Sequence, residues 1–127
     1  MRRLAASVAV VALVLTSAVP VVAATETVTG KIVDQSCYMK DKANNAGLDH
    51  KMPADMKDCA VACAKKGQPM ALLTTDGKVY TITGGLAAVN NAKLVPHISH
   101  TVSITGDVPT KGSEMTIAAA DLKMVSR

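Results

Sequence analysis

Hydrophobic and polar residues alternate along residues 27–38 (TVTGKIVDQSCY), a segment rich in β-branched side chains. Alternation with a period of two residues is the pattern of a strand that buries one face. Residues 39–53 (MKDKANNAGLDHKMP) contain many Lys, Asp, Asn and Gly residues and keep no period. The pattern therefore predicts a first strand followed by a loop.

A short helix is predicted over the next segment, ADMKDCAVACAKKG. Asp55 is the expected N-cap, Asp58 lies in the first turn and two lysines lie in the last, so the charges complement the helix dipole. Gly67 comes directly after the helix, where a residue with a left-handed backbone commonly ends one.

The rest of the chain predicts strands with one more helix between them. PMALLTTDGKVYTITGG has two apolar runs around Asp76-Gly77, a turn pair that accepts positive φ at both central positions, and this pattern predicts a β-hairpin. Residues 86–98 (LAAVNNAKLVPHI) predict a second short helix that Pro96 ends. Two closing strands are expected in HTVSITGDV and EMTIAAADLKMV, on either side of the turn-like PTKGS.

This order of elements is typical of an OB-fold, in which five strands carry a helix between the third and the fourth. We therefore expect a mainly β protein, a small five-stranded OB-like Greek-key barrel, with the cysteine-bearing helix inserted between strands one and two. Gly30 and Gly106 lie inside predicted strands, where they suit the bends of a small barrel. A plain antiparallel sheet with two helices on one face is the alternative.

The first 24 residues, MRRLAASVAVVALVLTSAVPVVAA, have the pattern of a secretory signal peptide, with cleavage expected after Ala23 or Ala24. Residues 25–127 are then one domain of roughly 103 residues, large enough for one modest core. An uncleaved anchor is the alternative, because residues 4–24 are nearly long enough to cross a bilayer of about 30 Å. Cleavage would leave a periplasmic or secreted protein without stable membrane insertion.

Composition argues against a nucleic-acid-binding protein. The leader takes two of the 14 basic residues and none of the 10 acidic ones, so the net charge falls from +4 to +2. The chain has no Trp, no Phe and only two Tyr residues, and so lacks the aromatic platforms on which single-stranded nucleic acid stacks.

Three cysteines are the candidate chemistry of this chain. Cys37 ends the first predicted strand, whereas Cys59 and Cys63 are four residues apart on the predicted helix and share one face of it. The three sulfur atoms converge if that helix packs against the end of the strand. This placement leaves three interpretations open.

The first interpretation is a disulfide between Cys37 and either Cys59 or Cys63, which suits an oxidising compartment. It closes a loop of roughly 23 to 27 residues and contributes about 3 to 4 kcal/mol in the chain-entropy model. A bond between Cys59 and Cys63 is the least favourable pairing, because thiols at i and i+4 of a regular helix do not face each other well. The domain is then a disulfide-stapled module for a small ligand or a protein, with one free thiol.

The second interpretation is a soft-metal site on all three thiolates. His50 is the candidate fourth ligand of a zinc site of the Cys₃His type. Nearby methionine thioethers would suit Cu(I) better than zinc, although methionines on a helix face more commonly fill a core.

The third interpretation is a reactive thiol. Cys59 is expected in the first turn of its helix, where the dipole lowers a thiol pKa. The sequence has no C-x-x-C pair and no carboxylate pair suited to acid and base catalysis, so an enzyme is not expected. His97 and His100 are expected near the surface at the entry to the fourth strand.

The string GKIVDQSC, followed by His50, DCAVACAKKG, a D-G hairpin and HTVSITG, resembles a group of small exported bacterial proteins of unknown function. They share D-x-x-C, a histidine, C-x-x-x-C and a closing V-x-x-T-G strand. The resemblance implies an OB-type barrel in which Asp34, Cys37, Cys59 and Cys63 form the functional or stabilising unit. Our leading expectation is a non-enzymatic exported protein that binds zinc or copper through these cysteines and His50.

Overall fold

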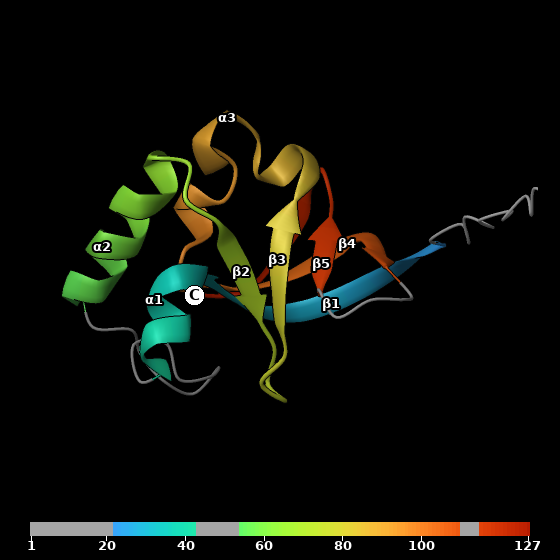
Figure 1. Cartoon of the computed structure of the whole chain (residues 1–127), viewed down its shortest axis with the longest axis horizontal. Helices are drawn as coiled ribbons and strands as arrows, with labels where there is room; N and C mark the ends of the chain where they lie inside the picture. The colour runs from blue at the N-terminus through green and yellow to red at the C-terminus, as the bar shows by residue number, and fades with distance from the viewer. Residues whose placement is uncertain (1–21, 43–53, 110–114) are drawn as a thin grey trace, which may run out of the picture.

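A computed structural model of the chain describes residues 22–42, 54–109 and 115–127. The predicted leader lies almost wholly outside these residues, although the first strand already begins at Ala23. Figure 1 shows the strands wrapped around one another, with α1 and α2 at one end of them and α3 near another. The elements are β1 (Ala23–Asp34), α1 (Gln35–Lys40), α2 (Ala54–Lys65), β2 (Met70–Leu73), β3 (Val79–Thr83), α3 (Ala88–Asn91), β4 (Thr101–Pro109), β5 (Thr116–Ala118) and β6 (Leu122–Ser126).

Five of the strands close into a barrel. β1 pairs antiparallel with both β2 and β4, β2 pairs with β3, β3 pairs in parallel with β5, and β5 pairs with β4 through Asp107 and Ala118. This circuit has β1 as the shared strand and a parallel step between β3 and β5. The prediction of a mainly β, small OB-like barrel is therefore confirmed, and the alternative of an open sheet with two helices is wrong.

The last predicted strand is divided in two. The segment EMTIAAADLKMV forms β5 and β6, with the chain turning at residues 119–121. β5 meets β4 at Asp107, whereas β6 pairs with Thr101–Ile104 at the other end of β4. The three-residue break therefore lets one segment close the barrel and then add a sixth strand beside β4.

Glycines permit the close approaches that barrel closure requires, as predicted. Residues of β1 up to Lys31 pair with β4, and residues from Lys31 onward pair with β2. Gly30 lies at this change of partner, where a Cβ atom would come within 2.5 Å of the Leu73 carbonyl oxygen. A Cβ atom on Gly106 would lie 2.8 Å from the Cβ atom of Ala119. A side chain at either position would therefore push two paired strands apart.

The hairpin between β2 and β3 is present, but its turn differs from the predicted one. The Thr74 N–H donates to the Lys78 carbonyl at 2.9 Å and the Gly77 N–H donates to the Thr74 carbonyl at 3.0 Å. Only Gly77 of the turn pair has a positive φ, 84°. The loop is thus a three-residue connection with one left-handed residue, in which Asp76 keeps an ordinary backbone.

The helix predicted over residues 86–98 is broken into short pieces. One turn of 3₁₀-helix (Gly84–Leu86), α3 and a second 3₁₀ turn (Val95–His97) follow one another, and Val89 and Asn90 have left-handed φ values of 52° and 53°. The cause is tertiary: the buried Asn91 amide donates to two carbonyls at 2.9 Å, those of Ala64 and Gln68, at the end of α2. These bonds outweigh the local preference for one regular helix.

Helix α2 ends as predicted and begins earlier than predicted. The Gly67 N–H donates to the Ala64 carbonyl and the Gln68 N–H to the Cys63 carbonyl, and Gly67 has a φ of 81°, which together form a Schellman motif. Because α2 begins at Ala54, the predicted N-cap residue Asp55 lies inside the helix. Within the described residues, no helix is long and apolar enough to cross a membrane.

Two clusters of buried side chains hold the fold together. The larger fills the barrel and receives Ala60 and Ala64 from α2. The smaller lies under α1 and joins Tyr38 to side chains from β1 and β2, with Val79 of β3 packed against it. Each of the two helices that carry cysteines is thus anchored to the barrel by its own apolar contacts.

Candidate functional site: a thiol cluster at the end of strand β1

Helix α1 positions the first cysteine, although the sequence predicts a strand and a loop there. β1 ends at Asp34, whose carboxylate accepts a hydrogen bond of 3.0 Å from the Cys37 N–H and so caps the helix. Asp34 is 1% exposed. A buried aspartate is costly without hydrogen bonds, so this side chain is fixed at the junction of β1 and α1. An Asp three residues before Cys37 was the signal for this cap, but the alternating pattern concealed it.

Helix α2 brings the other two cysteines to the same place. Ala60 and Ala64 pack into the barrel core, and the cysteines that precede each of them lie beside that apolar stripe. Cys63 is half-buried and Cys59 is exposed. Figure 1 shows α1 and α2 next to each other at one end of the barrel. The predicted convergence of the three cysteines therefore occurs between two helices rather than between a helix and a strand end.

Electrostatic and hydrogen-bonding contacts join Cys37 and Cys63 to Asp34 and join Cys59 to both of these cysteines. Burial, the charge of Asp34 and contact with Cys59 raise the pKa of the Cys37 thiol, in that order. Burial, hydrogen bonding with Asp34 and the nearby Cys59 raise the pKa of the Cys63 thiol to about 11. Cys59 thus contacts both other thiols. We call these four residues the thiol cluster.

The contacts in the thiol cluster are pairwise. None of the three cysteines is in a disulfide, and among the described residues no group of three or more His, Cys, Asp or Glu side chains is placed to hold a metal ion. The predicted fourth ligand, His50, lies outside the described residues. The cluster is therefore a set of thiol contacts around the buried Asp34 side chain, in which Cys59 contacts both other cysteines.

Cys59 is not in the first turn of its helix. It is the sixth residue of α2, because the helix begins at Ala54. The helix dipole acts mainly within the first turn, so the predicted place of Cys59, on which the reactive-thiol interpretation depended, is wrong. What distinguishes Cys59 from the other two thiols is its exposure.

The histidine pair lies deeper than predicted. His97 and His100 are half-buried rather than at the surface, and their rings meet edge to face with centroids 6.1 Å apart. The pair is a packing contact beside the entry to β4, and no further ligand-type side chain joins it among the described residues.

The thiols should react with iodoacetamide at very different rates. The thiolate is the reactive form, so a rise of the Cys63 pKa from 9.0 to about 11 lowers its reactive fraction about 100-fold at pH 8. Cys59, which is exposed, should react first, and Cys63 should accelerate about tenfold per pH unit up to pH 11. Mass spectrometry of peptides after timed alkylation measures each rate.

Asp34→Asn is the matched control for this prediction. The amide keeps the shape and an acceptor for the Cys37 N–H but removes the charge that raises the thiol pKa values, so Cys63 should react faster in the variant. Equal rates for Cys59 and Cys63 below pH 9 in the original protein would contradict the account of the cluster.

Comparisons of the chain with protein-family models, with curated proteins and with solved structures give no match. The resemblance to exported bacterial proteins stays a prediction.

Proposed function

We propose that this protein is a small non-enzymatic binding protein that holds a soft metal ion, zinc or copper, on the thiolates of Cys37, Cys59 and Cys63. One observation carries the proposal: the Cys59 thiol contacts the other two, and both of those contact the Asp34 carboxylate. The leader-like segment supports a site of action in the periplasm or outside the cell, since residues 1–24 have the pattern of a signal peptide.

The chemistry of the donor set fits a soft cation. Thiolates are the ligands that zinc and Cu(I) prefer, and three of them beside a carboxylate would repel one another in the absence of a cation. Burial and, after it, the neighbouring Asp34 and Cys59 raise the pKa of the Cys37 and Cys63 thiols, so these two thiols hold their protons more tightly when no metal is bound. Metal binding would release these protons and would join α1 to α2.

Zinc and Cu(I) would differ in whether they use Asp34 or His50 as a ligand. Zinc commonly takes four ligands and accepts an oxygen or nitrogen donor beside thiolates. Asp34 is buried beside the thiols and His50 precedes α2 in the chain, so either residue is a candidate fourth ligand. Cu(I) would use the sulfur atoms alone.

Metal titration of the reduced protein tests the proposal. Co(II), a spectroscopic substitute for zinc, should produce thiolate-to-cobalt charge-transfer absorption that saturates at one equivalent and disappears on addition of zinc. Cu(I) binding is measured in parallel by competition with a coloured chelator. Met39→Leu, which changes an exposed thioether on α1, is the control that should bind as the original does. Failure of both metals to bind at one equivalent would overturn the proposal.

A disulfide is the second candidate, and the geometry favours one pairing. The Cys37 thiol contacts the Cys59 thiol, so a Cys37–Cys59 bond would form with little movement. It would leave Cys63 beside Asp34. The domain would then be a stapled binding module. Peptide mapping without reductant identifies this bond, and a different pairing would contradict this candidate.

A further inference from the structure

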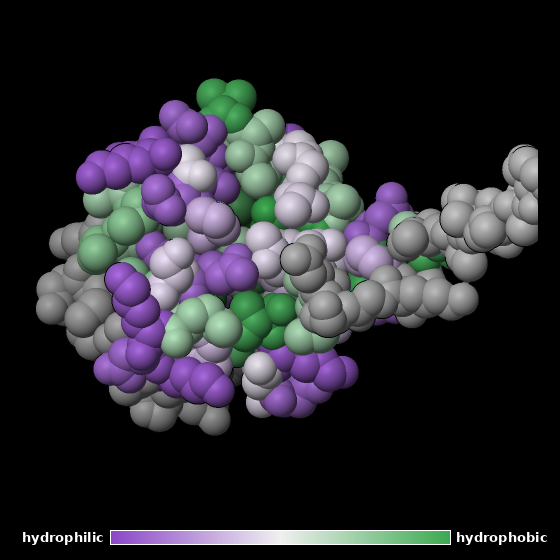
Figure 2. All heavy atoms as spheres, in the orientation of Figure 1, coloured by the Kyte–Doolittle hydropathy of each residue, from purple (hydrophilic) through white to green (hydrophobic). Residues whose placement is uncertain are grey.

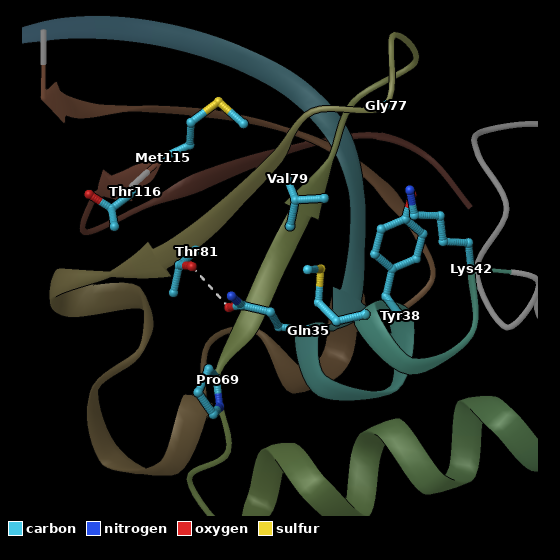
Figure 3. A pocket seen from close by; sticks show the side chains of 10 residues that line it. Gln35, Tyr38, Lys42, Pro69, Gly77, Val79, Thr81, Met115 and Thr116 are labelled. Carbon is cyan, nitrogen blue, oxygen red and sulfur yellow. Dashed lines mark hydrogen bonds between the residues drawn. The ribbon is translucent and has the colours of Figure 1, made fainter. Parts of the chain in front are cut away.

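A pocket lies beside α1, and none of the four residues of the thiol cluster lines it. It occupies about 610 Å³ between α1, the first half of β3 and the start of β5. Figure 3 shows Tyr38 and Lys42 on one side of the pocket, Val79 and Thr81 at its base, and Met115 and Thr116 on the opposite side. Figure 2 shows an apolar patch on this face of the molecule, with hydrophilic residues below it. We call this feature the α1–β3 pocket.

We infer that the α1–β3 pocket binds a small amphipathic molecule with an apolar body and one anionic group. The pocket is bordered by α1, which follows β1, and by Met115, which directly precedes β5, and the connections at these two places flank ligand sites on five-stranded barrels of this kind. Its volume falls within the range of about 300 to 1,000 Å³ that small-molecule sites occupy.

The apolar part of the pocket has a fixed base and an adaptable rim. Tyr38 is 7% exposed and packs with Val79 in the smaller core cluster, so this part of the wall is held by the fold. Met39 and Met115, at 65% and 40% exposure, are flexible thioether side chains that adapt to the shape of an apolar group. An apolar ligand body would cover side chains that are now open to water.

The polar groups of the pocket favour a negative charge. Among the described residues that line the pocket, Lys42 is the single charged side chain and none is a carboxylate. The nearby Lys78 is paired with Asp76 at 3.4 Å, whereas no ion pair of Lys42 is present within the described residues. The Thr81 hydroxyl donates to Gln35 Oε1 at 2.9 Å, which leaves the amide N–H groups of Gln35 to donate to a ligand. The lining therefore offers donors and one cation.

A nucleic acid strand fits this surface poorly. Binding of single strands uses several stacked aromatic rings and a basic groove, whereas the described part of the lining has one aromatic ring, Tyr38, and one cation, Lys42. A compact ligand with one apolar body and one negative charge matches this single ring and single cation.

This inference does not rest on metal binding. α1 is held without any metal, because Asp34 caps it, the Gln35 N–H donates to the Pro69 carbonyl at 3.3 Å and Tyr38 is buried. The pocket should therefore bind its ligand in reduced, metal-free protein, and its failure would leave the proposed metal function untouched.

Two fluorescent probes with the same aromatic body test the proposal. 1-Anilinonaphthalene-8-sulfonate carries one anion, and N-phenyl-1-naphthylamine lacks it. Both should bind the folded, metal-free protein at one site. Lys42→Gln should weaken the sulfonate about tenfold, the scale of a lost charge-assisted hydrogen bond, and leave the neutral probe unchanged. Lys123→Gln, which changes an exposed lysine on β6 outside the pocket, is the matched control. It should change the binding of neither probe.

A second variant addresses the apolar wall. Met115→Glu places a carboxylate at the rim, where the side chain is already partly exposed. It should weaken the binding of both probes, and that of the sulfonate more than that of the neutral probe. Circular dichroism and thermal unfolding establish that each variant is folded. Binding of the sulfonate that is unaffected by both substitutions, or that falls equally in Lys123→Gln, would overturn the proposal.

Discussion

Replacing Gly106 with alanine is expected to lower the free energy of unfolding by about 3 kcal/mol or more, the upper range for overpacking a closed structure. The new Cβ atom would lie 2.8 Å from the Cβ atom of Ala119 and 2.9 Å from the Ala118 carbonyl carbon. These contacts are at the place where β4 meets β5 and the barrel closes. Because the obstacle is backbone, neither strand yields without losing its pairing.

Gly77→Ala is the matched control for this prediction. Gly77 has a φ of 84°, but no atom lies within 4 Å of the position that its Cβ would take. This change should therefore cost only the conformational strain of a left-handed alanine, about 1 kcal/mol. Urea unfolding, monitored by circular dichroism, measures the loss of unfolding free energy in both variants. A smaller loss for Gly106→Ala than for Gly77→Ala would contradict the account of barrel closure.

Replacing Cys59 with serine is expected to weaken zinc or Cu(I) binding about 100-fold. Cys59 contacts both other thiols, so its loss removes one ligand and the sulfur that connects the set. Structural zinc sites bind with about 10 to 16 kcal/mol over four ligands, or roughly 3 kcal/mol per ligand, which corresponds to about two orders of magnitude in affinity. Competition with a chelator of known affinity measures the change.

Cys63→Ser separates the metal proposal from the disulfide one. If all three thiolates bind a metal, serine at position 63 weakens binding about as much as serine at position 59. If a Cys37–Cys59 disulfide is the relevant state, Cys63→Ser leaves the stability without reductant unchanged, whereas Cys59→Ser lowers it by about 3 to 4 kcal/mol. Unchanged metal affinity in both variants would contradict the metal site.

The barrel could be predicted because local signals agreed with the global fold. The segments with a period of two predicted the order of the strands, and the glycines inside them marked the places where strands approach closely. Gly67 predicted the end of α2. The misses have tertiary causes. Asn91 imposes left-handed residues on the connection after β3 by bonding the end of α2. Helix α1 was concealed because its first four residues, up to Tyr38, fall within the segment predicted to form the first strand.

The candidate site was predictable in part. The spacing of Cys59 and Cys63 places both on one face of a helix, and that face does meet Cys37. The grouping of Asp34 with the thiols followed only from the resemblance to exported proteins, and its role as the cap of α1 was not predicted. No sequence pattern predicted the α1–β3 pocket, because its walls come from α1, β3 and β5, which are far apart in the chain.

The most direct test of the thiol cluster as a metal site uses the protein as the cell makes it. The protein is purified without added metal, its metal is measured by elemental analysis, and its free thiols are counted after denaturation with a chelator present. We predict close to one zinc or copper ion per chain and three free thiols. One free thiol and no metal would contradict the proposal and would identify a disulfide in its place.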